Sequence, residues 1–391
     1  MQLKNKRLPA RIAQNSAFIL FGTLAFSLAS SAVAQEKIVK IGHVAPITGP
    51  IAHLGKDNEN GARMAIDELN KKGVTIGGQK VKFELLTEDD AADPKQANAA
   101  AQKLVDARIS GVIGHLNSGT SIPASKIYYD AGIPQISPST TSPKYTHQGF
   151  NTTFRVVAND VQLGGALGRY AASKMHAKTA AIIDDRTAYG QGVAQEFANS
   201  ARKAGLKIVS KQYTNDKATD FNAILTAIKA KNPDIIFFGG MDAVAGPMLR
   251  QMNQLAINAH FMGGDGICTE QLGPLAGDGM ADGQVICAEA GGVEGEQKKQ
   301  LEAFKAAYKK KFGYDVKLYA AYVYDAVMTM AQAMQEAQSS EPAKYLPKLA
   351  KIQYQGVSGP IVFDANGDLK DAALTLYTFR KGERSVVAVT H

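Results

Sequence analysis

The stretch GVIGHLNSGTSIPASKIYYDAGIPQISPS (111–139) contains a complete strand–helix–strand unit. Its first six residues form an apolar run that predicts a buried strand, and IPQISPS (133–139) predicts a second strand. Between them, SIPASKIYYDAG (121–132) predicts a helix that ends at a glycine. A strand, a helix and another strand in this order are typical of a parallel α/β sheet.

The same alternation extends in both directions along the chain. Upstream, the runs 38–46 and 81–89 predict strands, and 60–73 and 94–107 predict helices. Downstream, four strands and three helices are predicted at 179–185, 189–205, 207–214, 221–232, 234–240, 245–256 and 260–266. Strands that are apolar throughout favour parallel sheets covered by helices on both faces. A break near Phe154–Asp160 divides the series, so we expect two α/β lobes.

The C-terminal part of the chain does not begin a third series. Segments 301–313 and 318–337 predict long helices. The run SGPIVFDANGDLK (358–370) and the following LTLYTFRKGE (374–383) predict an antiparallel hairpin, because Asn-Gly at 366–367 favours a tight turn.

The N-terminus has the layout of a secretory signal peptide. Four basic residues precede the apolar stretch AFILFGTLAFSL (17–28), and small residues follow at Ala32 and Ala34. We expect cleavage after Ala34, so that residues 1–34 are lost and the mature chain is soluble and lies outside the cytoplasm. The apolar core is shorter than the ~20 residues of a membrane-spanning helix. Loss of the leader reduces the net charge from +8 to +4, and a weakly basic surface of mixed sign predicts no nucleic-acid partner.

The chain has two cysteines, Cys268 and Cys287. In an oxidising compartment we favour a disulfide between them, and the alternative is a pair of buried free thiols.

Sequence motifs give no positive support for an enzyme, a cofactor or a metal. The segment GPIAHLGK (49–56) resembles a phosphate loop but has one residue too many between its glycines. Ser118 lacks the glycine two positions earlier that a nucleophile elbow needs. The histidines show no metal-ligand spacing.

Polar residues follow several predicted strands, where ligands of parallel α/β sheets bind. They are Ser118, Ser139, Thr141, Asp185, Tyr189 and Asp265. Hydroxyls and free amides at a helix N-terminus suit a carboxylate, and a buried carboxylate suits an ammonium group. The set therefore predicts a site for an amino acid zwitterion. Taken one at a time, Ser118–Ser121 could be an ordinary helix cap, Ser139–Pro143 an ordinary turn and Asp265 a loop residue.

The chain resembles the periplasmic leucine/isoleucine/valine-binding proteins of branched-chain amino-acid ABC transporters. The motifs TGPIAHLG (48–55), EDDAADPKQA (88–97), ISPSTTSP (136–143) and FMGGDG (261–266) occur in family order, among others. The resemblance implies an α/β, type I periplasmic binding fold of two lobes that the chain connects by three hinge crossings. It further implies a periplasmic protein that closes on one amino acid and docks on an inner-membrane ABC permease. We expect a monomer, because both lobes must move. We expect lobe I to comprise 37–158 and 290–357, and lobe II to comprise 159–289 and 358–391.

The resemblance also implies roles for individual residues. The hydroxyl and amide of Ser118 would hold the ligand carboxylate, helped by Thr141. The Ser139 carbonyl and the Thr141 hydroxyl would take the ammonium group, and Asp265 would complete that site from lobe II. Tyr189 would close over the α-carbon. The side-chain pocket would be lined by Leu116, Asn117, Leu54, Met241 and Tyr319.

Several positions depart from the family pattern. Leu54 and Met241 stand where the best-known members have tyrosines, and Asp265 stands where they have a glutamate. A flexible methionine adapts to several ligand shapes. Ala92 and Asn117 replace the cysteines of the family's first-lobe disulfide.

Three other functions remain open at this point. A binding protein of the same fold could take an amide, an aromatic acid or another small carboxylate ligand, although these would not need Asp265. A ligand-sensing lobe of a receptor would normally be tethered. A secreted hydrolase would need a base beside Ser118.

Overall fold

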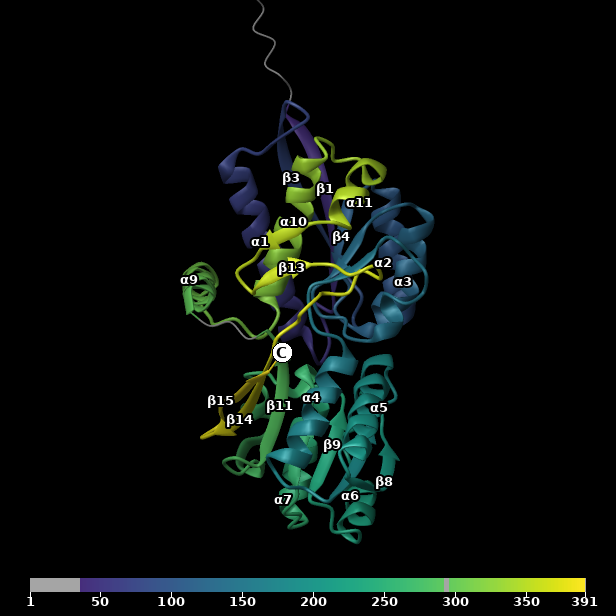
Figure 1. Cartoon of the computed structure of the whole chain (residues 1–391), viewed down its shortest axis with the longest axis vertical. Helices are drawn as coiled ribbons and strands as arrows, with labels where there is room; N and C mark the ends of the chain where they lie inside the picture. The colour runs from purple at the N-terminus through teal and green to yellow at the C-terminus, as the bar shows by residue number, and fades with distance from the viewer. Residues whose placement is uncertain (1–35, 292–294, 391) are drawn as a thin grey trace, which may run out of the picture. The chain divides into compact units, whose positions relative to one another are not determined.

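Two large β-sheets and a small two-stranded sheet organise the described residues, 36–291 and 295–390, of the computed structural model (Figure 1). The predicted signal peptide (1–34) lies outside the described residues. Within the described ranges, no helix combines the length and the apolar character that crossing a bilayer requires.

The first sheet has six strands, and its central strands are parallel. In spatial order they are β2 (Thr75–Ile76), β3 (Gln79–Asp89), β1 (Lys37–Ala45), β4 (Gly111–Gly114), β5 (Gln135–Ser137) and β6 (Thr153–Arg155). Only β2 pairs with its neighbour in the antiparallel sense. The strand–helix–strand unit quoted above is therefore confirmed as β4, α3 (Ser118–Asp130) and β5.

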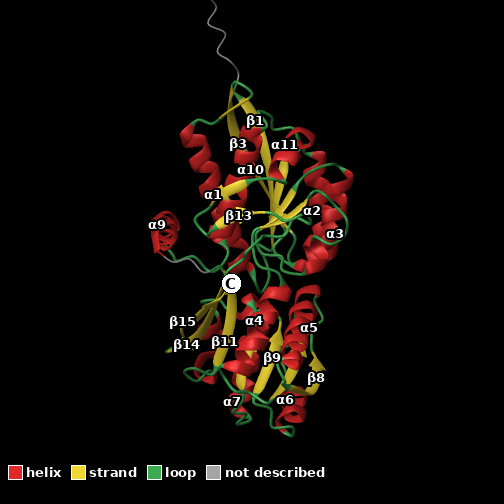
Figure 2. Cartoon of the chain, viewed as in Figure 1, coloured by secondary structure: helices red, strands yellow, loops and turns green. Residues whose placement is uncertain are grey.

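Helices cover this sheet in two layers. One layer includes α1 (Ala52–Lys72) and α10 (Ala320–Glu336), which pack together, and the other includes α2 (Pro94–Asp106) and α3 (Figure 2). Val112 and Ile113 are adjacent in β4 and both fully buried, because successive side chains of a strand point to opposite faces. The helices α9 (Gly295–Phe312) and α11 (Pro342–Leu349) both follow the second sheet's parallel strands in the chain.

The second sheet has seven strands and is mixed. In spatial order they are β15 (Glu383–Thr390), β14 (Leu374–Arg380), β11 (Val285–Ala290), β10 (His260–Gly263), β9 (Ile235–Gly239), β7 (Thr179–Asp184) and β8 (Lys207–Tyr213). The strands β8, β7, β9, β10 and β11 are parallel. The first four of these were predicted from the sequence, and β11 was not. Its helices are α4 (Asp160–Ser173), α5 (Ala188–Lys203), α6 (Asn222–Lys229), α7 (Asp242–Gln254) and α8 (Leu272–Ala276). Phe237 and Phe238 of β9 are fully buried in different apolar clusters, as expected for a sheet covered on both faces.

The C-terminal hairpin was predicted with the wrong pair of strands. Strand β13 (Pro360–Val362) pairs with β12 (Gln353–Gln355), whereas β14 pairs with β11 and with β15. The turn at 366–367 closes only a single bridge, between Phe363 and Leu369. The true hairpin turns at Lys381-Gly382, where both residues have positive φ, as a type I′ turn requires.

Part of the segment predicted for lobe II lies against the first sheet. The backbone N–H of Arg155 in β6 donates to the carbonyl of Gly367 at 3.0 Å, and the side chain of Asp368 also contacts Arg155. The range 358–391 therefore does not belong as a whole with the second sheet. The other lobe boundaries and the number of hinge crossings stay predictions.

Candidate ligand-binding site

The N-terminus of α3 presents free donors. Ser118 is its first residue, and the first amides of an α-helix have no partner within the helix. Asn117 precedes it, but its side chain caps none of these amides, and its Oδ1 has no hydrogen-bond partner among the residues described. The Oγ of Ser118 accepts from the Ser142 N–H at 3.3 Å, which leaves the hydroxyl hydrogen free to donate to a ligand.

The other hydroxyl groups near this helix end are mostly structural. Thr120 Oγ1 donates to the Asn117 carbonyl at 3.0 Å, and Ser139 Oγ donates to the Leu116 carbonyl at 3.0 Å. Ser121 Oγ lies 2.5 Å from the hydroxyl of Thr140. In contrast, the buried hydroxyl of Thr141 makes no hydrogen bond of ordinary geometry to any described residue. Of this cluster, the Ser118 hydroxyl remains available to a ligand, and the Thr141 hydroxyl interacts with the buried carboxyl group of Asp160.

Arg155 fixes the loop that carries Thr141. This fully buried residue of β6 donates to the carbonyls of Thr140 (2.7 Å) and Ser142 (2.9 Å), one on each side of Thr141. Its Nε donates to Asp368 Oδ1 at 2.5 Å. Arg155 was not among the predicted site residues. Its only signal in the sequence is an arginine within an apolar strand.

Asp265 is a buried carboxylate held by two tyrosines. It follows β10 in a 3₁₀ turn (Asp265–Ile267) and is 1% exposed. Tyr189 of α5 donates to Oδ1 and Tyr319 donates to Oδ2, both at 2.8 Å. Burial raises the pKa of Asp265, and the two hydroxyls partly offset this effect. Asp265 makes no salt bridge with any lysine, arginine or histidine in the described ranges.

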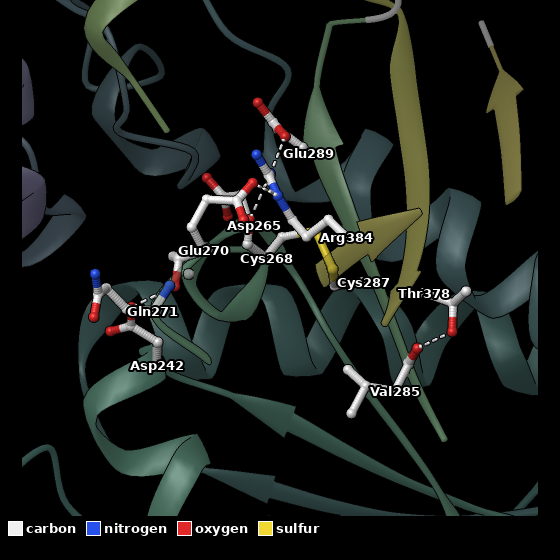
Figure 3. The surroundings of a disulfide bond; sticks show 12 residues. Asp242, Asp265, Cys268, Glu270, Gln271, Val285, Cys287, Glu289, Thr378 and Arg384 are labelled. Atoms are coloured by element: carbon white, nitrogen blue, oxygen red, sulfur yellow. Dashed lines mark hydrogen bonds and ion pairs between the residues drawn. A yellow bond between two sulfur atoms is a disulfide. The ribbon is translucent and has the colours of Figure 1, made fainter. Parts of the chain in front are cut away.

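The loop after Asp265 is pinned on two sides (Figure 3). A disulfide joins Cys268 to Cys287 of β11, with an S–S distance of 2.06 Å. Arg384 of β15 donates to the Cys268 carbonyl at 2.7 Å and forms ion pairs with Glu270 and Glu289 at 2.9 and 2.6 Å. These contacts fix the backbone from which Asp265 projects.

Two contacts join elements that pack on different sheets. Tyr319 immediately precedes α10 and bonds Asp265 of the second sheet. His53 of α1 lies 2.8 Å from Asp242 Oδ2 at the start of α7, and the same oxygen accepts from Thr269 at 2.5 Å. No such contact was predicted for His53.

The predicted pocket residues differ in burial. Leu54 and Leu116 are buried, whereas Asn117 and Met241 are half-buried. A Cβ at Gly266 would come within 2.8 Å of Met241 Sδ and of the Tyr189 ring, so a glycine there lets both side chains approach the Asp265 loop.

A cavity of about 520 Å³ opens between α3 and α5, and Gly119, Ser142 and Gly192 are among its lining residues.

Asp185, which was predicted at the ligand site, stabilises a turn, because its Oδ1 accepts from both the N–H and the hydroxyl of Thr187. In the part of the chain that the structure describes, no group of three or more histidine, cysteine, aspartate or glutamate residues is placed to hold a metal.

Comparisons with known proteins agree with this architecture. A family model described as periplasmic binding protein matches residues 38–384. The leucine-, isoleucine-, valine-, threonine- and alanine-binding protein of Pseudomonas aeruginosa is 32% identical over 93% of this chain and 95% of its own. The crystal structure of a leucine-binding protein from Thermotoga maritima has a TM-score of 0.81 at 26% identity, covering 90% of this chain and 98% of that one. A branched-chain amino acid transporter substrate-binding protein from Streptococcus pneumoniae, in complex with isoleucine, has a TM-score of 0.79 at 28% identity, covering 90% and 99%.

Proposed function

Because the chain belongs to the periplasmic binding protein family, we propose that it captures a free amino acid and delivers it to an inner-membrane ABC permease. The chain is a binding protein and not an enzyme. The favoured ligands are branched-chain or other aliphatic amino acids, which the names of its relatives support.

The observation that carries this proposal is the state of Asp265. A buried carboxylate without a cationic side chain beside it is costly, and two tyrosine hydroxyls compensate only in part. An incoming ammonium group would supply the missing charge. The ligand carboxylate would accept from the Ser118 hydroxyl and the first amides of α3, where the helix dipole favours negative charge.

Ligand binding would favour the closed arrangement of the two lobes. Ser118 and Thr141 lie beside strands of the first sheet, and Asp265 follows a strand of the second. A ligand that contacts all three can do so only when the lobes are together, so it shifts the population toward closure. The His53–Asp242 and Tyr319–Asp265 contacts would stabilise the same state.

The apolar side chains Leu54, Leu116 and Met241 would surround an aliphatic ligand side chain. Asn117 and Tyr319 would complete this pocket. We further propose that the mature protein is a periplasmic monomer.

A thermal-shift screen of the twenty proteinogenic amino acids, with benzoate and simple amides as comparison ligands, followed by calorimetry on the hits, tests this function. A ligand that binds only the folded state raises the melting temperature by mass action. We expect shifts with leucine, isoleucine, valine or alanine and none with benzoate or with simple amides. A shift with benzoate alone would contradict the proposal.

A further inference from the structure

Asp160, the first residue of α4, has an unusual carboxylate. It is fully buried, and neither oxygen makes a hydrogen bond of ordinary geometry to a residue in 36–291 or 295–390. No other carboxylate in these ranges has both oxygens buried without such a bond. Because an unpaired buried carboxyl group costs stability, a partner from outside the chain would relieve this cost.

The start of α4 does not need this carboxylate. Asn159 caps the helix, since its Oδ1 accepts from the N–H groups of Val161 and Gln162 at 3.1 and 3.2 Å. The Gln162 side chain in turn accepts from the Asn159 N–H at 3.0 Å and completes a capping box. The Asp160 side chain therefore takes no part in capping its own helix.

The surroundings of Asp160 are those of the ligand site. Its backbone N–H donates to the Thr141 carbonyl at 2.8 Å. Burial raises the pKa of its carboxyl group to about 8, and the nearby Thr141 hydroxyl opposes this shift. The carboxylates of Asp265 and Glu196 also raise that pKa, whereas Arg155 lowers it. Asp160 is thus close to two groups already assigned to the ammonium position.

The packing against α5 leaves room for this carboxylate. A Cβ at Gly192 would lie 2.6 Å from Asp160 Oδ2, so any other residue at position 192 would collide with it. Gly192 also lines the cavity between α3 and α5. The Asp160 carboxylate thus lies against a residue that lines this cavity, although Asp160 is not itself among the lining residues.

We propose that Asp160 is a second carboxylate partner of the ligand's ammonium group, together with Asp265 and Thr141. This inference rests on the proposed amino-acid function. Two carboxylates around one ammonium group make the site selective for amino acids over carboxylic acids of the same shape that lack the amine, because such acids leave both carboxylates unpaired.

The test compares L-leucine with L-2-hydroxy-4-methylpentanoate, in which a hydroxyl replaces the ammonium group. Calorimetry would give both dissociation constants for the wild type, for Asp160→Asn and for the control Asp325→Asn. Asp325 is also a buried carboxylate, but it accepts from the N–H groups of Val357 and Ser358 and has no place at the ligand site. L-alanine and L-lactate form a second pair of probes.

We expect the wild type to bind leucine at least 100-fold more tightly than its hydroxy analogue. Asp160→Asn should reduce this ratio tenfold or more, mainly by weakening leucine, and Asp325→Asn should leave it unchanged. Gly192→Ala should also lower the ratio, because its Cβ displaces the Asp160 carboxylate. This variant replaces Asp160→Asn in the test if Asp160→Asn does not fold.

A ratio within twofold of the wild type in Asp160→Asn would overturn the inference, whether the affinity for both ligands is kept or falls equally. If the wild type bound neither leucine nor alanine, the proposed function would fail and the inference with it. If the protein binds leucine but the ratio of the two dissociation constants is unchanged in Asp160→Asn, Asp160 is not a partner of the ammonium group and the proposed function still stands.

Discussion

Replacing Asp368 by asparagine should destabilise the first sheet and its ligand loop. Asp368 accepts from Arg155 Nε at 2.5 Å and from the Thr146 hydroxyl at 2.8 Å, and it lies 3.2 Å from His147. The substitution keeps the shape of the side chain but removes its charge, so the fully buried guanidinium of Arg155 loses its counter-ion. Breaking a buried ion pair in this way costs about 3–5 kcal/mol.

The pH dependence of this loss follows from the pKa of Asp368. Burial opposes ionisation, but Arg155 and the hydrogen bonds outweigh it and hold the pKa below its usual value. A lowered folded-state pKa means that the contribution is fully present above the ordinary value of about 4 and is lost as the pH falls through the folded value. The difference between wild type and Asp368→Asn should therefore be full at pH 7 and shrink below pH 4.

Urea denaturation followed by circular dichroism at pH 7 and at pH 3 measures both effects. The matched control is Asp130→Asn, which breaks an exposed pair with Lys126 and should leave the midpoint nearly unchanged. The Asp368→Asn variant should also bind the ligand more weakly, because Arg155 holds the carbonyls on both sides of Thr141. A wild-type midpoint at pH 7, or a loss that is the same at both pH values, would refute this reasoning.

Three further predictions concern other parts of the site. Replacing Cys268 and Cys287 by serine should lower the free energy of unfolding by about 3 kcal/mol, because the disulfide closes a loop with a sequence separation of 19. Identical urea midpoints of the wild type with and without a reductant would contradict this prediction. Because the pKa of Asp160 is raised to about 8 in the folded state, the ligand-free wild type should lose about 5 kcal/mol of stability relative to Asp160→Asn as the pH rises from 4 to 9. Denaturation midpoints converted to free energies of unfolding measure this loss, and a difference between the two proteins that does not change with pH would contradict the raised pKa. His53→Ala should weaken ligand binding roughly tenfold in calorimetry, because it removes the contact with Asp242 that joins the two lobes, whereas an unchanged dissociation constant would show that closure does not depend on it.

The parallel strands were predictable because their signal is local. The apolar run that became β4 buries Val112 and Ile113 on opposite faces, and a run with no polar alternation requires such two-sided burial. The polar residues at strand ends were found by the same logic, because the carboxyl ends of parallel strands lie at one edge of a sheet. Ser118 and Asp265 could be selected for this reason.

Long-range contacts could not be predicted in the same way. Arg155 and Asp368 are 213 positions apart, and nothing in either segment indicates the other. The pairing of β14 with β11 likewise depends on the second sheet, whereas the Asn-Gly signal at 366–367 is local and led to the wrong partner. Asp160 was missed because an aspartate at a helix start is normally explained by the helix alone.

The start of α1 depends on close packing, which hydrophobic periodicity in the sequence does not reveal. The sequence predicted a helix over 60–73, but α1 begins at Ala52. A Cβ at Gly55 would lie 2.0 Å from the Pro46 carbonyl oxygen, so the glycine that weakens the helical signal is what allows the helix to start beside the end of β1.

Calorimetric titration of L-leucine into Asp265→Ala tests most directly whether the two lobes bind opposite ends of one zwitterion. Removing the partner of a buried charge costs 2–5 kcal/mol or more, so the account predicts that affinity falls about 100-fold or further while the melting curve of the ligand-free protein shows an intact fold. A dissociation constant equal to that of the wild type would contradict the account.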